Sequence, residues 1–427
     1  MEIYNIITLI IVLAAIFAYI NFRFIKLPST IGIMLISLLA SLIVIILGII
    51  SPVFFLKTTK AVGLIDFQAV LLHIMLSFLL FAGAIHIDIK KLRSERLSII
   101  TFSTIGVIIS TFVIGSLLYW VTSMVGLSVD YLYCLLFGSL ISPTDPIAVV
   151  GILKKANIPP SLEIKISGES LFNDGVGVVL FISIYQIATI GYDNISAWNI
   201  IWLFIREAGG GILFGWLLGY FGFLALRSID NYVVEVMITL AIVMGGYGFA
   251  EIIHVSGPLA MVMAGLITGN KSMNNVASNI SSDYIGKFWE MVDEMMNAIL
   301  FLLIGFEMLI IPFNSTLLFL GCISILIVLF GRLVSVWLPI TLLKYKNSFS
   351  KNTIPILTWG ALRGGISVAL ALSVPKYMYG EMIVSITYIV VLFSIVVQGL
   401  SIGKFTKRLV EKNPETAEPA LKKARFS

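Results

Sequence analysis

Charged residues are scarce in this chain of 427 residues. They make up 12% of the sequence, while 59% of it is apolar. A soluble domain carries about 25% charged residues. Because so few polar side chains cannot cover a water-soluble globule, the composition excludes a cytosolic enzyme, a secreted disulfide scaffold and a disordered chain.

Enzyme signatures are missing as well. The sequence has no Walker A pattern, no HExxH, no GxSxG and no CxxC, and its three histidines (His73, His86 and His254) do not group with the acids. Cys134 and Cys322 lie inside apolar runs, so they do not indicate whether the protein faces an oxidising or a reducing compartment. No enzymatic activity, cofactor or nucleic-acid partner is therefore predicted, and any transport has to run on ion gradients.

Long apolar runs are what the sequence has instead. A run of about 20 apolar residues crosses the ~30 Å hydrocarbon core as a helix. About thirteen such spans are predicted, at residues 3–20, 29–50, 66–85, 98–122, 131–153, 162–190, 198–226, 231–251, 257–269, 285–311, 315–343, 353–374 and 381–404. The first is interpreted as an anchor, since it lacks a basic start and a small-residue cleavage site. We expect one all-α polytopic membrane domain at 1–404 and a short basic cytoplasmic tail at 405–427.

The basic residues predict the orientation in the cell membrane. The loops after the odd-numbered spans and the tail, counted with Lys165, Lys287 and Lys404 at the adjoining span ends, hold 22 lysines and arginines, against three (Lys57, Lys60 and Lys376) on the opposite side. Positive loops stay in the cytoplasm. The N-terminus is therefore predicted outside and the C-terminus inside.

Span 5 carries an unusual polar break. It contains Ser142-Pro143-Thr144-Asp145-Pro146, and each proline disfavours helix at the preceding residue and removes a backbone donor. We expect the helix to break near mid-membrane. Asp145 then either caps the second half-helix or has a functional role, and the cost of a charge at that depth favours function.

Span 6 places four polar side chains on one helix stripe. Glu169, Ser170, Asn173 and Asp174 follow each other at i, i+4 spacing. One of the two acids is expected to neutralise an arginine. The remaining acid, the serine and the amide lie too close together to be explained by that ion pair. They indicate a functional site.

Span 12 has a second weak point, with Gly360, Gly364 and Gly365 around Arg363. Broken helices in matching places of two halves are typical of inverted-repeat transporters.

Arg332 in span 11 is another cationic residue within a membrane span, and it needs a carboxylate partner. In span 7, Arg206 and Glu207 with the ladder of Gly211, Gly215 and Gly219 are interpreted as a packing surface.

With these motifs, the chain resembles the monovalent cation:proton antiporters of the sodium/proton exchanger type, in their NhaP-like bacterial branch. The resemblance rests on Thr144-Asp145-Pro146, on residues 168–175 (GESLFNDG) and on Leu362-Arg363-Gly364-Gly365, with support from 257–270 and 288–305. It covers nearly the whole chain, in the expected order.

The resemblance implies antiport of sodium or lithium against protons, a part in pH homeostasis and a homodimer. It implies that Asp174 binds the cation or a proton, and that Asp145, Thr144 and Ser170 supply further oxygens to sodium. Asn173 is implied to hold the crossing helices, Glu169 to pair with Arg332, and Arg363 to offset half-helix carbonyl charge. In span 3, many members of this family carry an acid where this chain has Ala82, which puts a ligand from that helix in doubt.

Two other functions stay open at this point. One is a related carrier of potassium or an organic anion, although an anion would need more positive charge near the breaks. The other is an intramembrane aspartyl protease using Asp145 and Asp174. For antiport, we expect cation and proton to compete for Asp174 in an electroneutral cycle of alternating access.

Overall fold

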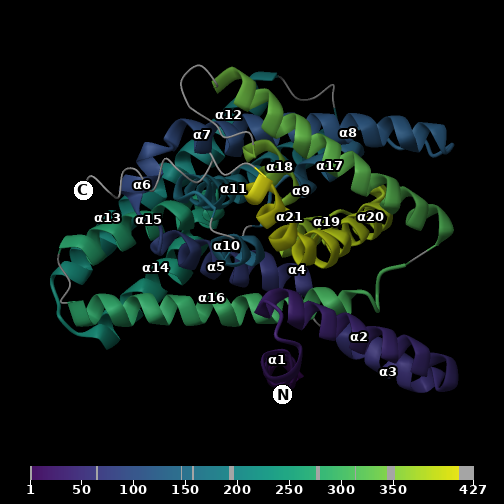
Figure 1. Cartoon of the computed structure of the whole chain (residues 1–427), viewed down its shortest axis with the longest axis horizontal. Helices are drawn as coiled ribbons and strands as arrows, with labels where there is room; N and C mark the ends of the chain where they lie inside the picture. The colour runs from purple at the N-terminus through teal and green to yellow at the C-terminus, as the bar shows by residue number, and fades with distance from the viewer. Residues whose placement is uncertain are drawn as a thin grey trace.

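The computed structural model describes residues 2–63, 66–145, 147–155, 158–191, 197–275, 279–312, 314–343 and 352–412. Pro146 and the tail beyond residue 412 lie outside the described residues. Within these ranges the chain is helical and has no strand. The predicted all-α polytopic class is confirmed (Figure 1).

The first half of the chain runs from α1 to α11. Its helices are α1 (Glu2–Ile20), α2 (Ser29–Ile50), α3 (Pro52–Gly63), α4 (Phe67–Ala69), α5 (Leu76–Ile85), α6 (Ile89–Ser94), α7 (Arg96–Thr101), α8 (Val107–Met124), α9 (Tyr131–Ile141), α10 (Ile147–Lys155) and α11 (Pro160–Ile190). π-Helical turns at Asn21–Ile25, Val70–Met75 and Phe102–Gly106 continue or join neighbouring helices without a break.

The second half runs from α12 to α21. Its helices are α12 (Ala197–Phe204), α13 (Gly210–Arg227), α14 (Tyr232–Ile252), α15 (Gly257–Asn275), α16 (Asn279–Glu307), α17 (Ser315–Leu343), α18 (Thr353–Trp359), α19 (Gly365–Leu372), α20 (Gly380–Phe393) and α21 (Gly399–Lys412). π-Helical turns at Ile205–Gly209 and Ser394–Gln398 join α12 to α13 and α20 to α21.

The membrane spans follow the apolar runs closely. Among the described residues, nine helices are long and apolar enough to cross a membrane. Spans 5 and 12 are broken as predicted, into α9 with α10 and α18 with α19. The exact number of thirteen spans and the repeat relation stay predictions. Helix α3 was not predicted, because Lys57 and Lys60 make its sequence too polar for a span.

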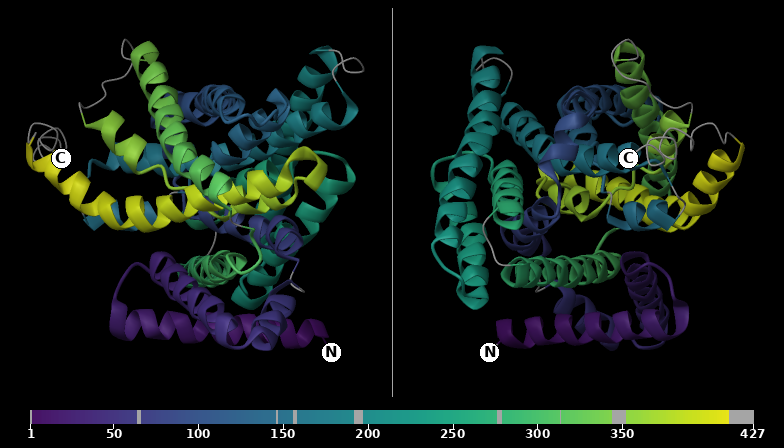
Figure 2. Two further views of the ribbon diagram at one scale, coloured as in Figure 1. Left: turned by 90° about the vertical axis from the view of Figure 1, so that its right-hand side faces the viewer. Right: turned by 60° about the vertical axis from the view of Figure 1, so that its left-hand side comes forward.

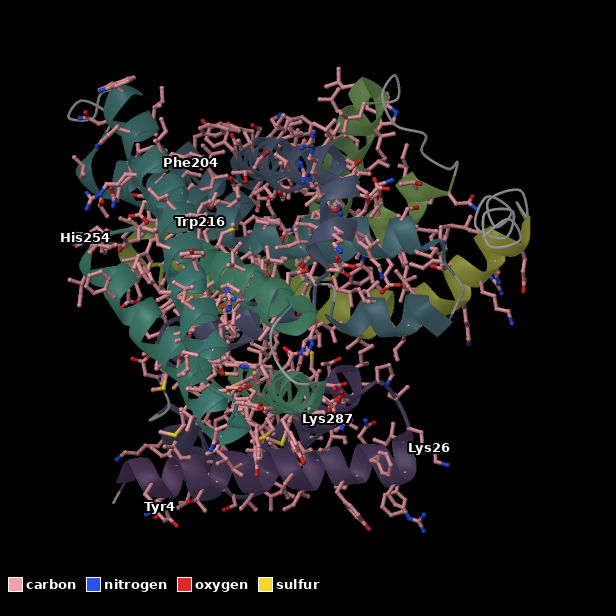
Figure 3. All side chains as sticks on the ribbon, turned by 90° about the vertical axis from the view of Figure 1, so that its left-hand side faces the viewer. Tyr4, Lys26, Phe204, Trp216, His254 and Lys287 are labelled. Carbon is pink, nitrogen blue, oxygen red and sulfur yellow. The ribbon has the colours of Figure 1, made fainter. Side chains whose placement is uncertain are left out.

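Exposed apolar side chains cover the outside of the bundle, as a surface facing lipid requires. Tyr4 on α1 and Trp216 on α13, both labelled in Figure 3, are exposed. Helix α1 packs against α2 and α16 and lies along one edge of the bundle in both views of Figure 2. Such exposure would promote aggregation in water, so the surface supports a protein embedded in a bilayer.

The glycine ladder of span 7 is a packing surface. A Cβ atom on Gly215 would come within 2.2 Å of the Ala260 carbonyl oxygen, and one on Gly219 within 2.9 Å of the Ala264 carbonyl oxygen. Helix α13 therefore packs backbone to backbone against α15. With α14, these helices form one end of the molecule, to the left in Figure 1, while the broken helices lie near its centre.

Candidate functional site: a cavity at two crossing broken helices

The two broken helices meet through their non-helical segments. The backbone N–H of Asp145 donates to the carbonyl oxygen of Leu362 at 2.8 Å. Helix α9 ends at Ile141 and α18 ends at Trp359. The prolines of span 5 and the glycines of span 12 account for these ends, since proline disfavours helix before it and glycine weakens helix. Contact between the two segments places Asp145 at the crossing.

Arg363 satisfies the carbonyl groups that the break in span 5 leaves without helical partners. Its Nη1 donates to the carbonyl oxygens of Ser142 at 2.6 Å and Pro143 at 2.8 Å. The hydroxyl of Ser367 donates to the carbonyl oxygen of Leu140 at 2.7 Å. The end of a helix carries partial negative charge on such carbonyls, so a buried guanidinium there is electrostatically favourable.

Two side chains of helix α11 form hydrogen bonds to the non-helical segment of span 5. Asn173 Nδ2 donates to Thr144 Oγ1 at 2.9 Å, and the Ser170 hydroxyl donates to the Thr144 carbonyl oxygen. The approach is close: a Cβ atom on Gly177 would lie 2.2 Å from Pro143 Cγ. Buried hydrogen bonds to both the side chain and the backbone of Thr144 hold the break in one geometry.

Glu169 does not belong to the cavity. Its Oε1 lies 2.5 Å from Nη1 of Arg332, and both side chains are buried. Arg332 Nε also donates to the Leu357 carbonyl oxygen at 3.2 Å. The pair thus connects α11, α17 and α18 and neutralises two charges that would otherwise be buried alone.

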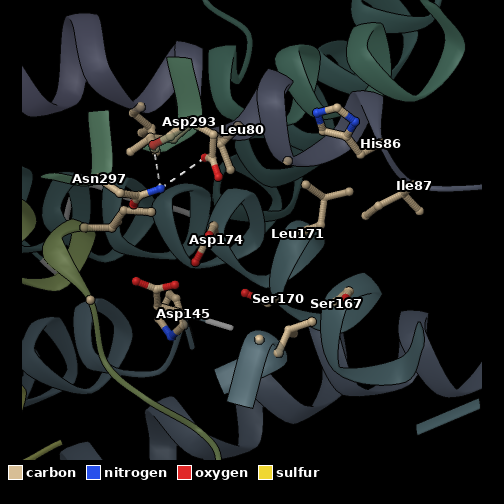
Figure 4. Close-up of a pocket in the computed structure, with 18 of the residues that line it drawn as sticks. Leu80, His86, Ile87, Asp145, Ser167, Ser170, Leu171, Asp174, Asp293 and Asn297 are labelled. Atoms are coloured by element: carbon tan, nitrogen blue, oxygen red, sulfur yellow. Dashed lines mark hydrogen bonds between the residues drawn. The ribbon is translucent and has the colours of Figure 1, made fainter. Parts of the chain in front are cut away.

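A cavity of about 740 Å³ opens beside the crossing. Asp145, Asp174 and Ser170 line it, and both aspartates are half-buried (Figure 4). Thr144 is buried, accepts the hydrogen bond from Asn173 and is not a lining residue. The structure therefore brings together most of the predicted oxygen ligands, while Thr144 sits behind the cavity wall.

Helix α16 adds two lining residues that the sequence analysis missed, Asp293 and Asn297. Both lie in predicted span 10 at i, i+4 spacing, so an acid and an amide shared one face of an apolar helix. The rule that an intramembrane acid is a candidate site residue would have found them. On span 3, Ala82 is buried in the apolar core and Gly83 lines the cavity.

The outer part of the cavity is lined by residues just after α5, in and beside α6, and in the first turn of α11. His86, Asp88, Lys91 and Glu163 lie there, beside the loops that follow spans 3 and 5. Partial burial lowers the pKa of His86, an effect that the nearby Glu290 opposes. Lys165, counted with the basic loop after span 5, is buried in α11 with its Nζ 3.3 Å from Glu95 Oε2.

The sequence places this arrangement among known proteins. A sequence profile described as "Sodium/hydrogen exchanger, transmembrane" matches residues 11–408. The chain belongs to the sodium/hydrogen exchanger family. It is 48% identical over 410 residues to the Na(+)/H(+) antiporter NhaP of Pseudomonas aeruginosa, covering 95% of this chain and 96% of that protein. It is 34% identical over 348 residues to the Na(+)/H(+) antiporter NhaH of Halobacillus dabanensis, covering 80% of this chain and 84% of that one.

The fold is that of a solved exchanger structure. The sodium proton antiporter MjNhaP1 from Methanocaldococcus jannaschii superposes with a TM-score of 0.75, covering 95% of this chain and 99% of that chain. The two sequences are 21% identical. The crossing broken helices of this exchanger-family chain therefore occur within a known antiporter fold.

Proposed function

We propose that the protein is a secondary antiporter that exchanges sodium or lithium for protons across the cell membrane. Cation and proton compete for Asp174, with Asp145 and Ser170 as further oxygen ligands. The observation that supports this proposal is the convergence of these three side chains on one cavity at the helix crossing. Membership of a family of exchangers favours transport over the intramembrane protease alternative.

The chemistry of exchange follows from the donor set. Hard cations are bound by oxygen, and carboxylates, hydroxyls and freed carbonyls are hard donors. A carboxylate beside another acid in a poorly solvated cavity favours its protonated form. An arriving cation favours the ionised form. Binding of one therefore displaces the other at Asp174, and exchange needs no separate coupling device.

The charges around the site favour an electroneutral cycle. Glu169 is neutralised by Arg332, and the residue next to Asp174 is the neutral amide Asn173. Asp145 stays ionised as a cation ligand or as the start of its half-helix. One proton then replaces one sodium ion.

The cavity faces the cytoplasm in the proposed topology, with the N-terminus outside. Its outer residues Asp88, Lys91 and Glu163 lie beside loops after odd-numbered spans, which carry most of the basic residues. This structure accordingly represents an inward-facing state of alternating access. A core of spans 5, 6, 11, 12 and 13 moves against the rest of a homodimer to expose the site outside, and the exchange contributes to pH homeostasis.

Reconstitution tests the function. The purified protein is placed in vesicles with an imposed pH gradient, and fluorescence dequenching reports proton movement on addition of sodium, lithium, potassium or choline. Sodium and lithium should collapse the gradient and choline should not. A response to potassium alone would favour the potassium carrier. No response to any of the cations would contradict antiport.

A further inference from the structure

A third carboxylate lines the ion cavity from outside the helix crossing. Asp293 belongs to α16, whereas Asp145 and Asp174 come from span 5 and α11. Figure 4 shows the Asp293 side chain across the cavity from Asp145, with Asp174 between them. Asp293 is half-buried, so it is in contact with the cavity and partly shielded from bulk water.

Asn297 orients this carboxylate and leaves an oxygen without a partner. Its Nδ2 donates to Asp293 Oδ1 at 3.1 Å and to the Asp293 carbonyl oxygen at 2.8 Å (Figure 4). Asn297 is only 2% exposed. Its Oδ1 is buried and has no hydrogen-bond partner among the described residues, although Asn297 lines the cavity. A buried amide oxygen without a partner carries a desolvation cost that a cation or its hydrating water removes.

Asp293 is a position separate from the central pair of aspartates. Among the described residues, which include Asp145, Asp174 and Asp293, no three His, Cys, Asp or Glu side chains are placed to hold one metal ion. In this structure the three aspartates therefore do not converge on one point. Carboxylate and amide oxygens on successive turns of α16 nevertheless supply two hard donors on one face.

The cavity as a whole attracts cations. Five of its lining residues are acids, against Lys91 and His86; the acids are Asp88, Asp145, Glu163, Asp174 and Asp293. A concave surface lined by one sign of charge concentrates the opposite ion. Cations that enter from the outer part of the cavity thus accumulate before they reach the crossing.

We propose that Asp293 and Asn297 form a second binding site for a monovalent cation, at which the ion docks on its way between the aqueous phase and Asp174. This inference rests on the proposed antiport. The docking site holds the ion through Asp293 Oδ and Asn297 Oδ1 together with water. It raises the rate of loading of the central site and leaves the number of protons exchanged unchanged.

The test is the sodium dependence of exchange in vesicles, for the wild type and three variants. Asp293→Asn should raise the KM for sodium about threefold to tenfold with kcat nearly unchanged, because a charge near an entry path acts mainly on association. Asn297→Leu removes the proposed amide ligand and the hydrogen bond to Asp293 Oδ1, so it should raise the KM by about the same factor. Glu294→Gln is the matched control, since Glu294 is the next residue on α16, is exposed and does not line the cavity. It should leave KM unchanged.

The outcomes separate this inference from the antiport itself. If the wild type fails to exchange sodium for protons, the proposed function is wrong. If the wild type exchanges and Asp293→Asn keeps the wild-type KM, or lowers kcat alone, the docking site is wrong. Asp293→Glu keeps the charge and should restore a KM within about twofold of wild type if charge governs association. Failure of this rescue in a variant that elutes as folded protein would also overturn the proposal.

Discussion

Glu169 and Arg332 form an ion pair, 2.5 Å from Oε1 to Nη1, in which both side chains are buried. The pair joins α11 to α17 at the level of the helix breaks. It removes one acid from the polar stripe of span 6 and leaves Asp174 as the stripe's carboxylate in the cavity. Glu169 and Asp174 are five residues apart, and the position of Arg332 determines that Glu169 is ion-paired whereas Asp174 lines the cavity.

Removal of either partner of this pair should destabilise the protein strongly. Glu169→Ala or Arg332→Ala leaves one buried charge alone, which costs about 3–5 kcal/mol. We expect a lower yield and a lower Tm in detergent for each single variant. The double variant should be more stable than the sum of the two losses predicts. Additive losses would contradict the pairing.

An exposed ion pair supplies the control for that measurement. Lys287 and Asp283 lie 2.6 Å apart on α16, with 69% and 61% of their side chains exposed. Solvent screens such a pair. Asp283→Ala should therefore leave the Tm unchanged. If its Tm fell as far as that of Glu169→Ala, the loss of stability would not be specific to the buried ion pair.

Asp174→Ala and Asp145→Ala should each abolish sodium/proton exchange. In the proposed mechanism, the first removes the group for which cation and proton would compete, and the second removes an oxygen ligand at the crossing. Both proteins should insert and elute as folded protein, because each side chain borders a cavity and is only half-buried. Gradient dequenching in vesicles measures the loss, with Asp283→Ala as the active control. Near-normal exchange by Asp174→Ala would refute its assignment.

The exchange rate should not depend on membrane potential. One proton for one sodium moves no net charge, whereas each net charge would couple the cycle to about 2.3 kcal/mol per 100 mV. Clamping vesicles with potassium and valinomycin at either polarity should leave the rate unchanged. Acceleration at one polarity and slowing at the other would indicate a second proton, with Glu169 the first residue to test.

Gly364→Ala should impair exchange by disturbing Asp145. A Cβ atom at Gly364 would lie 2.5 Å from Asp145 Oδ2, closer than van der Waals contact allows, so the carboxylate has to move. Gly245→Ala on α14 is the matched control, because its Cβ would meet nothing within 4 Å. That variant should retain wild-type exchange and gain up to about 1 kcal/mol of helix stability. Equal loss in both variants would contradict a specific effect at the crossing.

Much of the architecture was predictable because it depends on local chemistry. Apolar length set the spans, and Pro143 and the glycines around Arg363 set the two breaks. Helix α3 and the burial of Lys165 were not predictable in this way. A short polar helix has no hydropathy signal, and whether a lysine is in a loop or in an ion pair depends on where Glu95 lies.

The sequence by itself determined the membrane class, the broken helices and the polar stripe of span 6, since each follows from residues close together in the chain. Only the tertiary structure decided which groups meet. It set Arg363 against the Ser142 and Pro143 carbonyls, turned Thr144 toward Asn173, and brought Asp293 to the cavity from a helix more than a hundred residues away in sequence. These are long-range contacts, and the packing of helices that determines them leaves no periodic trace within a single segment.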